Sequence, residues 1–418
     1  MSGNSGLNAT PLSERVHIGL FGRRNAGKSS LINVLTGQSL AIVSDTPGTT
    51  TDPVSKAMEL LPLGPVLFID TPGIDDEGEL GSLRVQRSYQ VLNKTDIALL
   101  VVESACGPAP EDLALLDKIR EKKLPALLVF TKADRLGSPA DWERRIPGLD
   151  RVKALSVPYR IVSSATGTNI ADLKETLARL VPEKEPPFPL CADLVSPGDF
   201  AVLVIPIDKA APKGRLILPE QQAIRDLLDA GATAIVTQDD KLARTLASLG
   251  KEPRLVITDS QAFGAVDRIV PAHLPLTSFS ILMARHKGNL AQAVAGVARL
   301  KHLRDGDRVL ISEGCTHHRQ CGDIGTVKLP RWLAELTGKK LDLSWTSGTE
   351  FPLDLSPYHM IIHCGGCMLN EREMQYRYRW AGDQGIPITN YGIAIAHCHG
   401  ILKRSLGLFP DLVSKLDE

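Results

Sequence analysis

Apolar and polar residues alternate along the first 180 residues in a pattern typical of an α/β domain. Short apolar runs predict buried, mostly parallel strands at 16–21, 66–69, 97–102, 126–130 and 159–162. Residues 29–35 and 110–120 have helical spacing, and Gly37 is expected to end the first of these helices. The pattern therefore predicts a parallel sheet covered by helices.

The same alternation continues in two further segments. Strands are predicted at 200–207, 232–237, 255–258, 308–312, 341–345 and 359–362. Helices are predicted at 219–230, 239–249, 288–303, 330–336 and 370–381, with Gly231 and Gly250 ending the first two. Residues 181–189 hold four prolines and three charges, which favours a stiff, solvated linker. The expected architecture is three α/β domains in series, at 16–182, 190–273 and 275–418, after a flexible tail at 1–15.

The composition argues against several classes of protein. The 418 residues contain equal numbers of basic and acidic side chains, 48 of each, which argues against a general nucleic-acid surface. No apolar run is long enough to span a membrane, and the first thirteen residues lack the apolar core of a secretory signal. The chain is expected to be cytoplasmic, with neither a nucleic-acid nor a membrane partner.

Seven cysteines are too few, and odd in number, for a disulfide scaffold in so long a chain. Cys106 and Cys191 stand alone and are interpreted as ordinary small residues. The other five lie in the last quarter of the chain, at Cys315, Cys321, Cys364, Cys367 and Cys398. Clustered cysteines in a reducing compartment usually bind metal or carry out redox chemistry.

The loop after the first predicted strand carries a complete P-loop motif. It consists of Gly22, Arg23, Arg24, Asn25, Ala26, Gly27, Lys28, Ser29 and Ser30. The glycines let backbone N–H groups surround phosphates at the start of a helix. Lys28 is expected to reach the β- and γ-phosphates, and the Ser29 hydroxyl is expected to bind Mg²⁺.

Three further motifs follow at strand ends, in the order that a GTPase requires. Asp70 begins Asp-Thr-Pro-Gly, in which Asp70 is expected to hold the Mg²⁺ shell and the Gly73 amide to sense the γ-phosphate. Thr50 is expected to be the switch threonine on Mg²⁺. The base-reading motifs are Thr131-Lys132-Ala133-Asp134, which selects guanine through Asp134, and Ser164-Ala165, expected at guanine O6. Lys28, Thr50, Asp70 and Gly73 are the expected catalytic residues.

Two departures from the common GTPase pattern bear on the rate and on base binding. Thr131 stands where asparagine is usual, which weakens one contact near the base. Ile74 stands where Ras-like proteins carry the glutamine that orients water, so intrinsic hydrolysis should be slow. The motifs resemble the Era/TrmE branch of translation-factor GTPases. That resemblance implies that Asn25 binds a potassium ion.

The cysteines favour a metal site beyond a second sheet. Cys315 follows one predicted strand and His363-Cys364 follows another, and Cys364 and Cys367 have the Cys-x-x-Cys spacing. Ligands of open α/β sheets gather beyond the carboxyl ends of the strands. Zinc and an iron–sulfur cluster with one labile position fit this spacing about equally. His-Cys-His at 397–399 is interpreted as incidental. Candidates or neighbours for a fourth ligand are His317, His318, Cys321, Asp323 and His363.

The whole pattern, a GTPase of Era/TrmE type followed by Cys-x-His and a distant His-Cys-x-x-Cys, resembles the HydF family of FeFe-hydrogenase maturation GTPases. The resemblance implies that Cys315, Cys364 and Cys367 hold a 4Fe–4S cluster with an exchangeable site, and that the middle domain dimerises. It also implies a transient di-iron precursor received with two radical-SAM maturases and passed to apo FeFe-hydrogenase. Under the same resemblance, His317 and His363 belong to the motif without having to bind iron.

Two other interpretations remain. A GTPase of tRNA modification or ribosome assembly with a structural zinc domain would share the N-terminal motifs, but no basic, aromatic-rich stretch follows residue 190. A non-enzymatic iron–sulfur module with a vestigial GTPase would share the cysteines. Metal analysis distinguishes the zinc-containing alternative from the HydF interpretation. GTP turnover distinguishes the alternative with a vestigial GTPase from it.

Overall fold

The computed structural model describes residues 10–37, 54–74, 88–180, 188–207, 216–315, 323–348, 350–414 and 416. The chain divides into two units, residues 1–184 and 185–418. The division falls inside the proline-rich segment 181–189.

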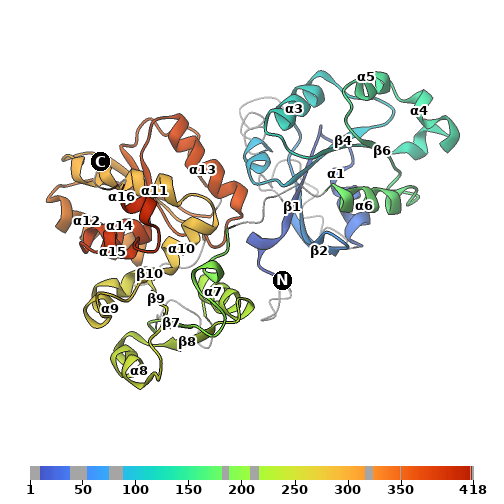
Figure 1. Cartoon of the computed structure of the whole chain (residues 1–418). Helices are drawn as coiled ribbons and strands as arrows, with labels where there is room; N and C mark the ends of the chain where they lie inside the picture. Colours follow the sequence, from blue (N-terminus) through green and yellow to red (C-terminus); the bar gives the residue numbers. More distant parts are fainter. Residues whose placement is uncertain are drawn as a thin grey trace. The chain divides into compact units, whose positions relative to one another are not determined.

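The N-terminal unit is built on a six-stranded sheet with helices on both faces (Figure 1). Its strands are β1 (Val16–Phe21), β2 (Val54–Leu60), β3 (Gly64–Asp70), β4 (Ile97–Glu103), β5 (Ala126–Thr131) and β6 (Tyr159–Ile161). Its helices are α1 (Lys28–Thr36), α3 (Pro110–Glu121), α4 (Trp142–Arg145), α5 (Leu149–Ala154) and α6 (Ile170–Arg179). The order is β2-β3-β1-β4-β5-β6, and every pairing is parallel except β2 with β3.

Burial on both faces explains why the strands of this sheet have continuous apolar sequences. In β4, Leu99 and Val101 join the core under α1 and α6, whereas Leu100 and Val102 join the core under α3. The five predicted strands and the two predicted helices of this unit are confirmed. The edge strand β2 was not predicted, because several of its side chains are exposed and it lacks an apolar run.

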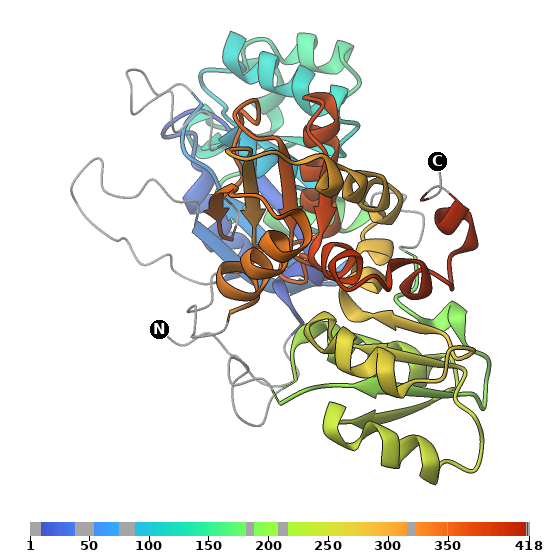
Figure 2. The same ribbon diagram turned by 90° about the vertical axis from the view of Figure 1, so that its left-hand side faces the viewer.

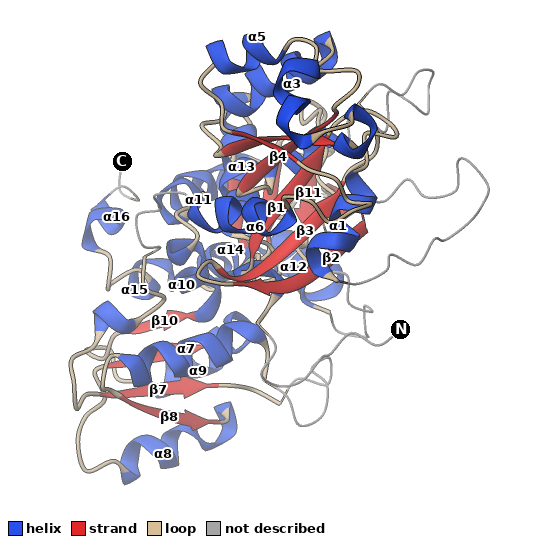
Figure 3. Ribbon diagram, turned by 90° about the vertical axis from the view of Figure 1, so that its right-hand side faces the viewer, coloured by secondary structure: helices blue, strands red, loops and turns tan. Residues whose placement is uncertain are grey.

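The C-terminal unit contains two four-stranded, wholly parallel sheets, coloured green to yellow and orange to red in Figure 2. The first has the order β10-β9-β7-β8, from β7 (Phe200–Val204), β8 (Thr233–Thr237), β9 (Leu255–Thr258) and β10 (Leu276–Ser278). Figure 3 labels β10, β7 and β8 of this sheet, and β9 lies between β10 and β7. Its helices are α7 (Leu218–Asp229), α8 (Leu242–Ser248) and α9 (Phe263–Ile269).

The second sheet has the order β12-β11-β13-β14. Its strands are β11 (Arg308–Ser312), β12 (Asp342–Thr346), β13 (Met360–His363) and β14 (Ile388–Asn390). The helices of this part are α10 (Phe279–His286), α11 (Leu290–Val297), α12 (Leu329–Thr337), α13 (Glu371–Asp383), α14 (Tyr391–Cys398), α15 (Leu402–Ser405) and α16 (Pro410–Ser414).

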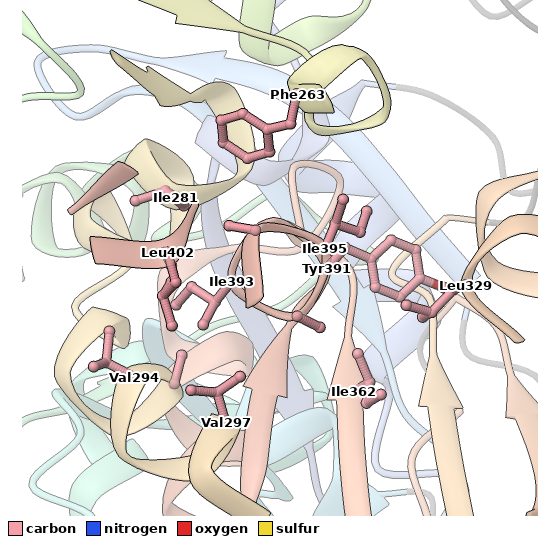
Figure 4. Close-up of a cluster of buried hydrophobic side chains, with 14 of the residues drawn as sticks. Phe263, Ile281, Val294, Val297, Leu329, Ile362, Tyr391, Ile393, Ile395 and Leu402 are labelled. Carbon is pink, nitrogen blue, oxygen red and sulfur yellow. The ribbon is translucent and has the colours of Figure 1, made fainter. Parts of the chain in front are cut away.

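One hydrophobic core joins the two sheets of the C-terminal unit. Val202 and Val256 of the first sheet belong to the same buried cluster as Ile362 of the second. Figure 4 shows Phe263 of α9 together with Ile393 of α14 in this cluster. Moreover, β10 pairs with β9, so the first sheet continues past residue 273, where the middle domain was expected to end. Residues 185–418 thus pack as one unit.

Most predicted elements of the C-terminal unit are present, with several differences. Gly231 ends α7 with a φ of 72°, as expected. The prediction that Gly250 ends the next helix is wrong, because α8 stops at Ser248 and Leu249 is already extended. The short strands β10 and β14 and the helix α10 were not predicted. Three-residue strands carry too little periodicity to be recognised in a sequence.

Candidate functional site

The loop between β1 and α1 has the backbone conformation of a phosphate-binding loop. Asn25 and Gly27 have positive φ angles, 61° and 94°, and Gly27 directly precedes α1. A side chain at Gly22 would collide with the carbonyl oxygen of Val101 in β4. Backbone N–H groups that curl in this way at a helix N-terminus attract phosphate oxygens.

Lys28 is held across this loop. Its Nζ donates to the carbonyl oxygens of Gly22 and Arg23, each at 2.8 Å. The side chain of Arg23 lies beside α3, where its Nε is 3.2 Å from Asp112 Oδ2 and its Nη2 donates to Gly107 O at 3.3 Å. Arg23 therefore supports the loop through α3, and Lys28 is the cation expected to reach the phosphates.

The carboxylate of Asp70, at the end of β3, contacts the start of α1. Ser29 Oγ donates to Asp70 Oδ2 at 2.5 Å, whereas the buried Oδ1 has no hydrogen-bond partner among the described residues. Burial raises the pKa of Asp70, and the Ser29 bond and the charge of Lys28 oppose that shift. A buried carboxylate oxygen beside a hydroxyl is an oxygen donor set suited to Mg²⁺. Ser29 and Asp70 fit the ion, and Thr50 lies outside the described residues.

A hollow of about 520 Å³ joins these motifs. It is lined by Arg24, Asn25, Gly27, Lys28, Ser29, Ser30, Asp70, Thr71, Gly73 and Lys132. The lining combines the P-loop, the Asp70–Gly73 turn and one residue of the base-reading motif. Residues from three segments far apart in sequence thus surround one space, which is the arrangement that a nucleotide requires.

The base-reading motif is held at the ends of β4 and β5. Lys132 has a φ of 56°, and its Nζ lies 2.7 Å from Glu103 Oε2. Ser163 Oγ donates to Asp134 Oδ1 at 2.6 Å and so orients the carboxylate that is expected to select guanine. The sequence prediction did not name Ser163; Ser164 and Ala165, which are expected at guanine O6, are the next two residues. The hydroxyl of Ser164 is buried with no hydrogen-bond partner among the described residues.

Thr131, the departure from the usual asparagine, connects the two halves of the nucleotide site. Its side chain is 1% exposed, and Oγ1 donates to the carbonyl oxygen of Ala26 at 2.5 Å. That oxygen belongs to the P-loop, whereas Thr131 ends β5. The hydroxyl therefore fastens the phosphate-binding loop to the strand that carries the base-reading residues.

In the second sheet of the C-terminal unit, two cysteines follow neighbouring strands. β11 pairs in parallel with β13, with Ser312 opposite His363, so Cys315 and Cys364 emerge at the same edge. β12 lies on the other side of β11, and the chain crosses back over β11 to form β13. This is a topological switch point, where open α/β sheets bind their ligands. The two strands are neighbours, which is the condition for both halves of the motif to meet at one edge.

Backbone amides surround the sulfur of Cys364. Gly314 N–H donates to Cys364 Sγ at 3.0 Å, and Gly366 N–H donates to it at 3.4 Å. Gly366 has a φ of 65°, and a side chain there would collide with Met374. Amide donors aimed at sulfur stabilise a thiolate and the sulfur ligands of a metal centre. Gly314 and Gly366 therefore bring their amides to the Cys364 sulfur.

The three thiols of the cysteine site, Cys315, Cys364 and Cys367, influence one another's charge. Burial, followed by the charges of Cys364 and Cys367, raises the pKa of Cys315, and burial and then Cys364 raise the pKa of Cys367 to about 11. Burial also raises the pKa of Cys364. Across the described ranges, no group of three His, Cys, Asp or Glu side chains is already arranged to hold a metal ion. A metal cation would supply the positive charge that three such thiolates need.

The histidines differ in their availability. His363 is fully buried; its Nδ1 is 2.7 Å from Cys364 O, and Arg377 Nη1 lies 3.0 Å from its Nε2. Burial first, then the charge of Arg377, lowers its pKa to about 3. With both ring nitrogens engaged, His363 does not offer a lone pair to the cysteine site in this arrangement. His317, His318 and Cys321 lie outside the described residues.

Cys398 belongs to a different environment. It ends α14 and packs against the large core of the unit, where burial raises its pKa to about 12. The neighbouring His399 makes an edge-to-face contact with Trp332, with ring centroids 5.3 Å apart. Cys398 is thus a partly buried packing residue, and His399 is exposed beside it.

Comparison with known families matches models to three parts of the chain. Residues 17–132 match the 50S ribosome-binding GTPase model. Residues 190–288 match the hydrogen maturase F dimerization domain, and residues 291–408 match the hydrogen maturase F tetramerization domain. The last two models together cover nearly the whole C-terminal unit.

Two curated relatives each match less than half of the chain. GTPase Era of Carboxydothermus hydrogenoformans is 33% identical over 175 residues, which cover 41% of this chain and 57% of that protein. The tRNA modification GTPase MnmE of a Synechococcus species is 37% identical over 175 residues, which cover 41% of this chain and 35% of that protein. The chain thus spans between about a third and somewhat more than half of the length of these relatives.

Solved structures match the chain with low TM-scores. A variant of Aquifex aeolicus Era bound to GDP and AlF4⁻ has a TM-score of 0.37 and 22% identity, covering 53% of this chain and 92% of that chain. The G domain of the T. maritima FeoB iron transporter has a TM-score of 0.31 and 26% identity, covering 40% of this chain and 99% of that chain. TM-scores this low support no conclusion about the function. Within the described ranges, no helix combines the length and the apolar character needed to cross a membrane.

Proposed function

The chain belongs to the hydrogen maturase F family, and we propose that it is a GTP-hydrolysing scaffold that assembles the di-iron subcluster precursor and delivers it to apo FeFe-hydrogenase. The observation that carries this proposal is the position of Cys315 and Cys364 at the switch point between β11 and β13. The same chain carries a GTPase unit with a formed P-loop. In this proposal the cysteine site holds the cargo, and the GTPase unit controls its transfer.

In this proposal Cys315, Cys364 and Cys367 hold a 4Fe–4S cluster. Three protein thiolates leave one iron with an exchangeable position, and that position would accept and release a ligand of the di-iron cargo. The amide donors of Gly314 and Gly366 would support the negative charge on the sulfur atoms. The large core beneath the loop would limit access of water to the site.

The GTPase unit would bind GTP with Mg²⁺ held by Ser29, Asp70 and Thr50, and with K⁺ near Asn25. Partner affinity would change through the segments around Thr50 and Asp70–Gly73, since γ-phosphate contacts order such segments and hydrolysis releases them. Hydrolysis should be slow, because Ile74 cannot orient water, and faster in K⁺ than in Na⁺. Equal rates in matched potassium and sodium buffers would remove K⁺ from the mechanism.

The partners in this proposal are two radical-SAM maturases, the apo-hydrogenase and further copies of the chain, in the cytoplasm. We assign residues 16–182 to GTP hydrolysis, 190–273 to dimerisation and 275–418 to the cluster. The dimerization and tetramerization models support an oligomer. The division of the chain near residue 184 supports separate folding of the GTPase.

The test is the conversion of each proposed cluster ligand to serine in the full chain, purified without oxygen. Cys315→Ser, Cys364→Ser and Cys367→Ser should each lose most of their iron and sulfide and fail to activate apo-hydrogenase. GTP hydrolysis should continue in all three. Cys398→Ser is the matched control, because that thiol ends α14, packs against the large core and is not a proposed cluster ligand. Normal iron content and normal maturation in all three variants would refute the proposal, and zinc in the wild-type protein would favour the alternative with a structural zinc domain.

A further inference from the structure

Arg377 is the largest fully buried side chain among the described residues, and it lies in α13 behind the cysteine site. Its Nε lies 2.9 Å from Glu373 Oε1, one turn earlier in the same helix. Burying an ion pair costs desolvation energy that the pair's own attraction often fails to offset. Stability alone is therefore a weak explanation for an arginine at this position.

The remaining donors of Arg377 reach the ends of three strands. Nη1 donates to Ser312 Oγ at 3.3 Å and to His363 Nε2 at 3.0 Å, and Nη2 donates to Gly348 O at 2.9 Å. Ser312 ends β11, His363 ends β13 and Gly348 follows β12. One guanidinium group thus binds the ends of the three strands that form this edge of the sheet.

Two of these contacts continue to the cysteines. Gly348 N–H donates to the carbonyl oxygen of Cys315 at 3.3 Å. His363 Nδ1 lies 2.7 Å from the carbonyl oxygen of Cys364. An arginine has no acceptor, so His363 Nε2 must accept from Arg377, and the ring proton must sit on Nδ1 and be donated to Cys364 O. Arg377 therefore selects the tautomer of His363 that holds the Cys364 backbone.

The ion pair of Arg377 with Glu373 has a definite orientation, as do the hydrogen bonds of Arg377. Glu373 contacts Nε, whereas the two Nη atoms contact the strand ends that lead to the cysteines. His363 and Gly348 in turn contact the backbone carbonyls of Cys364 and Cys315. The cationic end of the pair thus faces the backbone that carries these two cysteines.

We propose that Arg377 is a positioning residue of the cysteine site, which fixes the backbone of Cys315 and Cys364 and biases the site toward holding negative charge. The electrostatic half of this inference rests on the proposed function, since it concerns the cluster that the thiolates would hold. A cluster gains an electron on reduction, so a nearby cation favours the reduced state and a nearby carboxylate opposes it.

The charge is tested with a pair of variants in the full-length protein, reconstituted with iron and sulfide and titrated by EPR under controlled potential. Arg377→Gln should move the reduction potential to a more negative value, and Glu373→Gln should move it to a less negative value. A purely structural role would not produce shifts of opposite sign. Arg379→Gln, at an exposed position of the same helix, should leave the potential unchanged. Shifts of the same sign, or no shift in either variant, would overturn the electrostatic role.

The geometry is tested without a cluster, by amide hydrogen exchange at residues 313–315 and 364–367 in the metal-free protein. Arg377→Lys keeps the charge but cannot bind Glu373, His363 and Gly348 together, so exchange in both segments should be about tenfold faster. Unchanged exchange would overturn the positioning role. Gel filtration and thermal melting identify any variant that fails to fold, and Arg377→Lys and Glu373→Gln then carry the test. If the wild-type chain takes up no iron, the proposed function fails, and exchange still decides the role of Arg377.

Discussion

Thr131→Val should weaken nucleotide binding although its side chain contacts no phosphate. Valine has nearly the shape of threonine, so the packing around β5 is kept and only the hydroxyl is lost. Thr131 Oγ1 lies 2.5 Å from Ala26 O, a distance that a methyl group cannot occupy. The P-loop must therefore move away from β5, and the buried carbonyl of Ala26 loses this donor.

The expected magnitude follows from that lost bond. Leaving one buried polar group unsatisfied costs about 1–3 kcal/mol. If the nucleotide-bound loop bears most of this cost, GDP and GTP should bind roughly tenfold to a hundredfold more weakly, at about 1.4 kcal/mol per factor of ten. Thr131→Ser keeps the hydroxyl and should stay close to wild type.

The assay is equilibrium titration of the full chain with a fluorescent GDP analogue in the presence of Mg²⁺. Thermal melting of the nucleotide-free variants accompanies it, so that loss of folding is recognised. Binding of the valine variant within a factor of two of wild type would show that Thr131 does not fasten the P-loop to the base-reading strand. Equal weakening of the serine variant would show that packing, and not the hydroxyl, matters at this position.

Three further predictions concern the N-terminal unit. Asp134→Asn should weaken GTP binding by about tenfold or more, because a charged acceptor for guanine is lost, and competition with xanthosine triphosphate measures the change in preference. Gly22→Ala should abolish nucleotide binding in the same titration, because the new Cβ would meet Val101 O at a φ of 142°; wild-type affinity would contradict this P-loop geometry. Burial lowers the pKa of His17 below its usual 6.5, so the unfolded chain binds a proton at a pH where the folded chain does not. The stabilisation is complete above about pH 6.5 and is lost as the pH falls through the lowered pKa; thermal midpoints measured between pH 7.5 and 5.5 should fall less in His17→Gln than in wild type.

Much of the fold could be predicted because burial on both faces produces unbroken apolar runs. The strand at 97–103 is an example, since every residue before Glu103 is both apolar and buried. Strand β2 shows the opposite case. It pairs on one side only and exposes several side chains, so its sequence lacks the signal that a central strand carries.

The nucleotide motifs were recognisable because each depends on local backbone geometry at a strand end, which a few residues determine. The same reasoning did not single out Ser163, whose hydroxyl donates to Asp134. Local sequence could not identify this contact, because it depends on which hydroxyl faces Asp134 in the folded chain.

The sequence by itself determined the chemistry available to this protein: a phosphate-binding loop, a guanine-selecting carboxylate and three cysteines in metal-binding spacing. The tertiary structure decided which of these groups meet. It placed β11 beside β13, joined two sheets in one core and put Arg377 behind the cysteine site. Residues 312, 348, 363 and 377 are far apart along the chain, and contacts between such residues are set by how sheets and helices pack. Local patterns report the conformation of a segment, whereas its neighbours in space depend on packing across the whole unit.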